Sequence, residues 1–208
     1  PPPPFFFPAY EGIRDAQESR GLGVVYKIQG LNVVHYTLEL NEAYVGLRYD
    51  SIFSGVESQN LKYHKEEVME KLFNLKGNLT IKYYPTKSCT VNTLSAHLKK
   101  VTTFGTNVDM VLVDYADIMK STSKFTEKRH QIGHVYEELR GMAGEFDIPI
   151  WTASQANRSA LEEDVIGAEK VSEDYSKVMT ADFVMSMSRK CFMSPKIFAY
   201  VIILAILL

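Results

Sequence analysis

The stretch that most constrains the fold runs from Val108 to Tyr115 and reads VDMVLVDY. It is an apolar run rich in β-branched residues, and a single carboxylate, Asp114, stands near its end. Such a run is typical of a strand buried on both faces, as in a parallel sheet. Open α/β sheets bind their ligands outside the carboxyl ends of the strands. The stretch therefore predicts an α/β fold and makes Asp114 a candidate metal ligand beside a nucleotide.

Further elements follow from hydrophobic periodicity. We predict additional strands over Leu31–Leu40, Leu79–Tyr84, Asp147–Gln155 and Ala181–Ser188. Asn41 is the expected N-cap of a helix whose apolar stripe is Tyr44, Leu47, Ser51, Ile52 and Gly55. Other helices are expected over Tyr63–Leu75, over Thr90–Val101, and through a stripe of Ile132, Val135, Leu139, Met142 and Phe146 that follows a basic loop from Lys120 to Arg129. Strands that alternate with helices predict a mainly parallel sheet with helices on both faces.

Composition narrows the class of protein. With 208 residues, 46% hydrophobic and 23% charged, the chain fits one globular domain. Its net charge of -2 gives no overall basic field, so nucleic-acid binding would need local patches. The two cysteines, Cys89 and Cys191, stand in no metal-ligand spacing and suit a reducing cytoplasm.

The two ends of the chain differ from its middle. The opening PPPPFFFP has no positively charged region before it and is a poor signal peptide. The last 12 residues, from Ile197 to Leu208, are all apolar, but a spanning helix needs about 20 residues. We therefore expect no membrane role, and we expect this tail either to add a strand to the sheet or to expose an adhesive edge.

Three predicted strand ends bear polar side chains, namely Glu39, Asp114 and Gln155. Hydrolysis of a phosphoanhydride needs a cation on the phosphates, a carboxylate that orients the attacking water, and a sensor of the γ-phosphate. The set contains one candidate for each role. A carboxylate at a strand end is often only a helix cap or a solvated loop residue, so their ordered recurrence is the informative feature.

Three segments, YTLEL (36–40), MVLVDYADIM (110–119) and IWTASQANRS (150–159), resemble the ATPase core of DnaB-type hexameric replicative DNA helicases, particularly those of tailed bacteriophages. The resemblance extends from about residue 30 to 189 and includes SEDYSKVMTADFVMSMSR. It implies a RecA-like fold, ATP and Mg²⁺ as cofactors, single-stranded DNA as partner, a homo-hexamer in the intact family, possible contacts with primase and other replisome proteins, and a cytoplasmic location, in a bacterial host if phage-encoded.

The resemblance also implies roles for individual residues. Glu39 would polarise the attacking water, Asp114 would hold Mg²⁺ through its water shell, and Gln155 would sense the γ-phosphate. The DNA-contacting loops would follow Asp114 and Gln155. The nucleic-acid-binding candidates in those loops are Lys124, Lys128, Arg129, Asn157 and Arg158.

Two family features are missing from the sequence. A phosphate loop ends in Lys-Ser or Lys-Thr, whereas Gly21-Leu22-Gly23 is followed by no such pair. After Lys190 no basic finger of the Lys-x-Arg kind follows. We therefore expect an incomplete core that is inactive alone, with non-family segments at 1–29 and 191–208 around a partial ATPase domain at 30–190, as a truncated or frame-shifted reading would produce.

Two other functions share these residues. A recombinase of the RecA or RadA kind has the same strand-end acids, but the SQANR and DYSKVMTADFV segments favour the helicase. A non-catalytic binding or assembly module derived from an ATPase is favoured by the missing phosphate loop. Separate measurements of nucleotide binding and DNA binding would distinguish the module from the enzyme.

Overall fold

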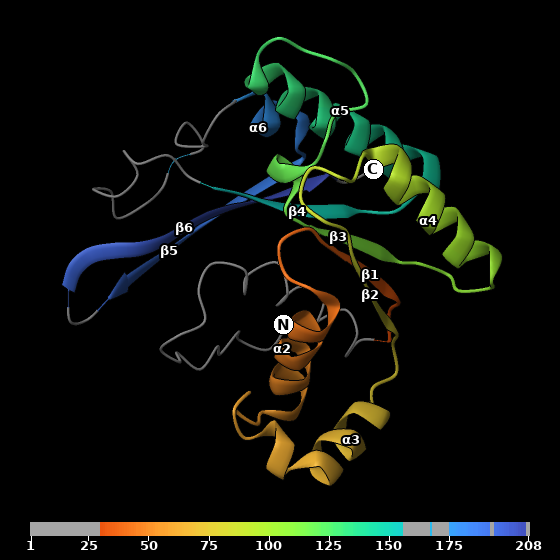
Figure 1. Ribbon diagram of the computed structural model, residues 1–208, viewed down its shortest axis with the longest axis vertical. Helices are drawn as coiled ribbons and strands as arrows, with labels where there is room; N and C mark the ends of the chain where they lie inside the picture. The colour runs from red at the N-terminus through yellow and green to blue at the C-terminus, as the bar shows by residue number, and fades with distance from the viewer. Residues whose placement is uncertain (1–29, 156–166, 168–174, 192–193, 207–208) are drawn as a thin grey trace.

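The computed structural model describes residues 30–155, 167, 175–191 and 194–206. Their centre is one six-stranded sheet in the order β2-β1-β3-β4-β6-β5 (Figure 1). The parallel strands are β1 (Val33–Thr37), β2 (Leu79–Tyr83), β3 (Met110–Asp114) and β4 (Ile150–Gln155). Two antiparallel strands complete it, β5 (Phe183–Cys191) and β6 (Ser194–Ile206). The predicted α/β class with a mainly parallel sheet is confirmed.

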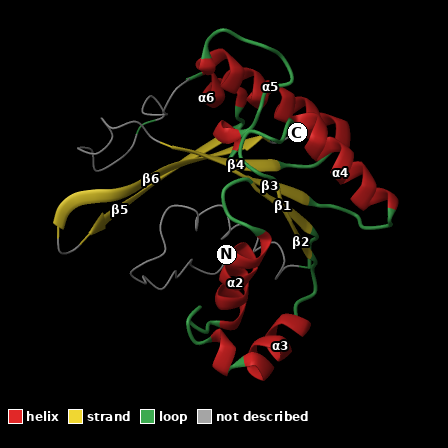
Figure 2. Ribbon diagram, in the orientation of Figure 1, coloured by secondary structure: helices red, strands yellow, loops and turns green. Residues whose placement is uncertain are grey.

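Helices cover both faces of the sheet (Figure 2). One face packs against α4 (Val91–Thr103), α5 (Lys128–Phe146) and α6 (Ser176–Thr180), and the other against α2 (Glu42–Ser54), beyond which lies α3 (Lys65–Phe73). Two short 3₁₀ turns are η1 (Leu61–Tyr63) and η2 (Ala116–Ile118). Successive side chains of a strand point to opposite faces: Val111 and Val113 of β3 join the α4–α5 core, whereas Met110 and Leu112 lie in a separate cluster.

The apolar stripe predicted for the first helix is wrong at Tyr44 and Leu47 but right at Ile52, which packs against the buried residues of the helix. Tyr44 and Leu47 are 61% and 44% exposed, whereas Val45 and Tyr49 are buried against β2. Val45 and Tyr49 are four residues apart and also repeat at helical spacing. Their face of the helix packs against Leu79 and Ile81 of the sheet. The start of the helix was predictable, because the Asn41 side chain accepts a hydrogen bond from the Tyr44 amide at 3.1 Å.

The later helices follow their predicted stripes. Val91, Leu94 and Leu98 of α4 are buried, as are Ile132, Val135, Leu139 and Met142 of α5. One boundary is wrong: α5 begins at Lys128, so Lys128 and Arg129 belong to its first turn and not to the preceding loop. Its start had no capping signal, and indeed Glu127 makes no side-chain cap.

The apolar tail adds a strand, which was one of its two expected outcomes. In β6, residues 201–206 pair with β4, and the strand also pairs along β5. Its Ile206 side chain is fully buried in the main core. Among the described residues, no helix is both long and apolar enough to cross a membrane.

Candidate functional site

The three predicted strand-end residues lie at one edge of the sheet. Thr37 of β1 is in register with Asp114 of β3, and Val113 is in register with Thr152 of β4. Glu39 follows β1 by two residues, Asp114 ends β3, and Gln155 ends β4. Because these strands are adjacent and parallel, their carboxyl ends bring all three residues to the same edge, as expected from the sequence.

Asp114 lies in the interior of this edge. Asp114 is only 3% exposed. Its Oδ2 atom is 3.9 Å from Nε2 of His35, a buried residue of the neighbouring β1. The other ring nitrogen of His35 is 2.9 Å from the hydroxyl of Tyr49 on α2. Helix α2 also supplies a cation: burial lowers the pKa of Arg48, and the charges of Asp114 and Glu39 oppose that shift. The charge of Arg48 therefore interacts favourably with both acids.

Glu39 is exposed in the bend between β1 and α2. The bend is attached to β3 by a backbone hydrogen bond of 2.9 Å from the Leu38 amide to the Asp114 carbonyl. The Thr37 hydroxyl also donates to the Leu40 carbonyl at 2.7 Å. These bonds hold Glu39 at the solvent side of Asp114, where a carboxylate has access to water.

Gln155 reaches the same edge through Tyr115. Its side-chain amide donates to the Tyr115 hydroxyl at 3.4 Å, a long hydrogen bond. The pKa of Tyr115 is raised, first by burial and then by the charges of Glu39, Asp117 and Asp114. The phenol therefore stays protonated among the acids and can serve as a hydrogen-bond donor. Tyr115 was not among the residues predicted from the sequence, although it directly follows Asp114.

A second polar cluster, also not predicted from the sequence, lies behind this edge. Nζ of Lys177 on α6 donates to Asp117 Oδ2 at 2.8 Å and to the Ser154 hydroxyl at 3.0 Å. The Ser154 and Tyr136 hydroxyls donate to the Asp117 carboxylate at 2.8 and 2.7 Å. Lys177 is fully buried. Burial, together with the Asp117 charge, raises the pKa of Tyr136. We call Lys177, Asp117, Ser154 and Tyr136 the Lys177 cluster.

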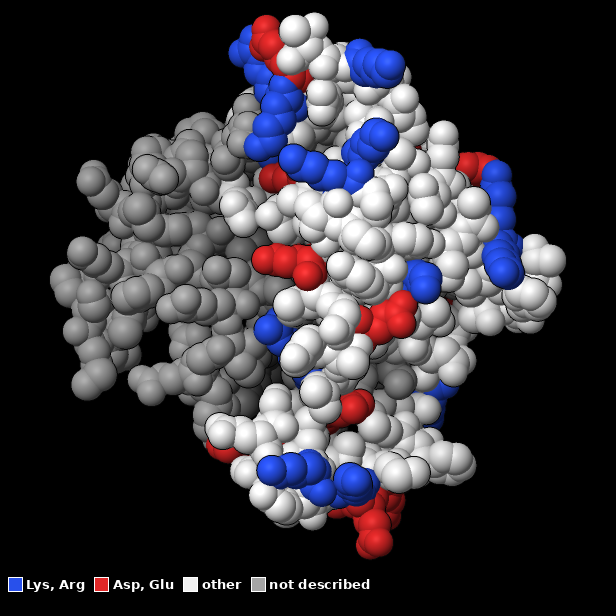
Figure 3. Space-filling view, viewed as in Figure 1, with Lys and Arg blue, Asp and Glu red and all other residues white. Residues whose placement is uncertain are grey.

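The basic candidates lie at the surface near the start of α5. Lys124, Lys128 and Arg129 are exposed, and Figure 3 shows Lys and Arg side chains gathered over α5 and the loop before it. Nε of Arg129 is 2.7 Å from Glu127 Oε2, so part of its charge is neutralised locally. Asn157 and Arg158 lie outside the described residues.

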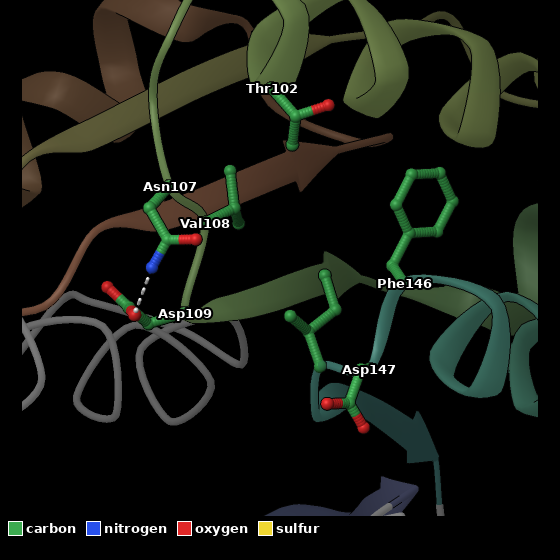
Figure 4. A pocket seen from close by; sticks show the side chains of 7 residues that line it. Thr102, Asn107, Val108, Asp109, Phe146 and Asp147 are labelled. Atoms are coloured by element: carbon green, nitrogen blue, oxygen red, sulfur yellow. Dashed lines mark hydrogen bonds between the residues drawn. The ribbon is translucent and has the colours of Figure 1, made fainter.

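No group of three or more His, Cys, Asp or Glu residues that could hold a metal occurs in the described part of the chain. A hollow of about 320 Å³ lies elsewhere, at the amino ends of β3 and β4 (Figure 4). Its lining residues include Asn107, Asp109 and Asp147, which precede those strands. It is therefore on the opposite edge from Asp114 and does not belong to the candidate site.

Comparison with known proteins gives a consistent result. The family "DnaB-like helicase C terminal domain" matches residues 22–190. The chain is 26% identical over 180 residues to the DnaB-like replicative helicase of Enterobacteria phage T4, covering 80% of this chain and 38% of that protein. It is 28% identical over 133 residues to the replicative DNA helicase DnaB of Helicobacter pylori, covering 61% of this chain and 27% of that protein.

Solved structures agree on the fold. One solved ATPase domain superposes with a TM-score of 0.66 at 15% identity, over 79% of this chain and 61% of that one. A DnaB-like replicative helicase studied for its interactions with primase superposes with a TM-score of 0.65 at 15% identity, over 79% and 41%. The chain thus spans well under half the length of the sequence relatives it matches.

Proposed function

Because the chain belongs to the DnaB-like helicase C terminal domain family, we propose that it is part of the RecA-like ATPase domain of a replicative DNA helicase. In the intact protein this domain couples ATP hydrolysis to movement along single-stranded DNA. The main support is the convergence of Glu39, Asp114 and Gln155 at one edge of the parallel sheet. That edge is where open α/β sheets bind their ligands.

Each of the three residues has a role in this proposal. Exposed Glu39 orients the attacking water. Gln155, which is hydrogen-bonded to Tyr115, senses the γ-phosphate. Asp114 faces Mg²⁺. A single buried carboxylate suits an ion that keeps several waters and binds phosphate oxygens, and the described residues offer no all-protein cage. When bound, Mg²⁺ would neutralise charge on the phosphates. The positive charge of Arg48 interacts favourably with both acids.

We predict that the 208-residue chain alone shows no Glu39-dependent ATP hydrolysis. Backbone amides of a phosphate loop and its lysine are the main anchor of a bound triphosphate, and no such loop occurs in the sequence. The measurement is steady-state phosphate release by the purified chain and by Glu39→Gln. Equal rates for the two proteins are expected, whereas a clear loss of turnover in Glu39→Gln would contradict the prediction.

We also predict that the chain binds single-stranded DNA through the loop before α5 and the start of that helix. Replacing both Lys124 and Lys128 by alanine should weaken binding of a labelled oligo-dT. It should also make log K less dependent on log salt, with a slope change of about 0.7 for each phosphate that is no longer neutralised. The matched control is the double alanine variant of Lys62 and Lys65, two exposed lysines at η1 and the start of α3. Equal effects of the two double variants would argue against this interface.

The proposal extends to assembly and location. A homo-hexamer, contacts with primase and a host-cell cytoplasm are proposed for the intact protein, as the family resemblance implies. One such relative was solved with attention to its primase interactions. The missing phosphate loop favours a second candidate, a module that binds DNA or other subunits without hydrolysing ATP. DNA binding without measurable nucleotide binding is the result that distinguishes this module from an enzyme.

A further inference from the structure

The Lys177 cluster ties together the two segments that leave the candidate site. Asp117 lies three residues after Asp114, and Ser154 directly precedes Gln155. Lys177 donates to both, at 2.8 and 3.0 Å. A second link runs beside it: the Ala116 amide donates to the Thr152 hydroxyl at 3.0 Å. The turn after β3 and the end of β4 are therefore joined by side chains as well as by the sheet.

The third member of this connection is α6. This helix begins at Ser176 and follows the segment after Gln155 along the chain. Lys177 thus attaches the start of α6 to the turn after β3 and to the end of β4. Tyr136 of α5 closes the cluster, since its hydroxyl donates to Asp117 at 2.7 Å and its ring centroid is 5.7 Å from Lys177 Nζ.

A buried ammonium group is a poor choice for filling space alone, because removing its charge from water costs free energy. Methionine has a similar length and no desolvation cost, and replacing a buried ion pair by apolar residues is often neutral or stabilising. The ion pair differs from an apolar contact in being directional, because each hydrogen bond works only within a narrow range of distance and angle. Such a cluster therefore fixes the positions of the two strand ends relative to each other.

We infer that Lys177 is a positioning residue that holds the turn after Asp114 and the end of β4 in one fixed arrangement, so that the turn and the strand end shift together. This inference deepens the proposed function, on which its consequence for DNA rests. With Lys177 in place, a change at Gln155 is transmitted to the loop that bears Lys124. Without it, the two segments move independently.

The first test measures amide hydrogen exchange in the full chain. The main variant combines Lys177→Met with Asp117→Asn, which removes both charges and leaves no unpaired ion. Its matched control combines Lys99→Met with Glu145→Gln, an exposed pair at 2.6 Å. In the main variant only, we expect the backbone amides of both segments, 115–119 and 152–155, to exchange faster, by between about twofold and thirtyfold. Acceleration in neither segment, in one alone, or equally throughout β1 and α4 would overturn the inference.

The second test measures oligo-dT binding by fluorescence anisotropy. The main variant should bind between about twofold and thirtyfold more weakly, with an unchanged salt slope, because Lys177 is buried and touches no phosphate. Lys177→Arg, which keeps the charge, should retain more affinity than Lys177→Met. A lowered salt slope, or unchanged affinity, contradicts positioning. If the unmodified chain binds no DNA, the proposed function fails, while the exchange measurement still decides the role of Lys177.

Discussion

Replacement of Lys177 by methionine is expected to lower the free energy of unfolding by about 3–5 kcal/mol. The variant leaves the Asp117 carboxylate, whose side chain is 10% exposed, without the ammonium group at 2.8 Å. Two hydroxyl donors remain, but they do not balance a full charge. Urea unfolding followed by circular dichroism measures the loss. Adding Asp117→Asn should restore at least half of it, because the uncompensated charge is then removed.

The matched control is Lys99→Met. Lys99 and Glu145 form an ion pair of similar length, 2.6 Å, but their side chains are 60% and 48% exposed. Exposed ion pairs contribute less than about 1 kcal/mol because water screens both partners. If Lys177→Met lowers the free energy of unfolding no more than Lys99→Met does, burial does not strengthen the ion pair between Lys177 and Asp117.

Replacement of Leu98 by alanine is expected to cost about 2–5 kcal/mol. Leu98 is completely buried in the core between α4 and the sheet. Removing its side-chain atoms forfeits their transfer free energy and leaves a cavity that close-packed neighbours fill only in part. The same urea titration measures the change, and a shifted midpoint with an unchanged slope is the expected form.

Leu47→Ala is the control for this second prediction, because it makes the same substitution on the exposed side of α2. Leu47 is 44% exposed, and surface changes usually stay within about 0.5 kcal/mol. The pair also tests the corrected face of α2, since the apolar stripe predicted from the sequence includes Leu47. A loss for Leu47→Ala equal to that for Leu98→Ala would support the original stripe.

The candidate site divides into residues that local sequence identifies and residues that it does not. Asp114 is identifiable because it ends an apolar run, and Glu39 and Gln155 because they stand at the ends of two other predicted strands. Arg48 gives no such signal, since an arginine on an amphipathic helix is usually solvated. Its interaction with the charges of Asp114 and Glu39 arises because α2 packs against β2 and places Tyr49 beside His35 of β1.

The sequence by itself determined the strands, their alternation with helices, and the polar residues at their ends, because each depends on periodicity within a few residues. Only the tertiary structure decided which stripe of α2 is buried, that the apolar tail pairs with β4, and that Lys177 meets Asp117, 60 residues away. Those outcomes depend on contacts between distant segments. The strand that ends at Asp114 lies between β1 and β4 in the sheet, and His35 of β1 places its ring beside the Asp114 carboxylate.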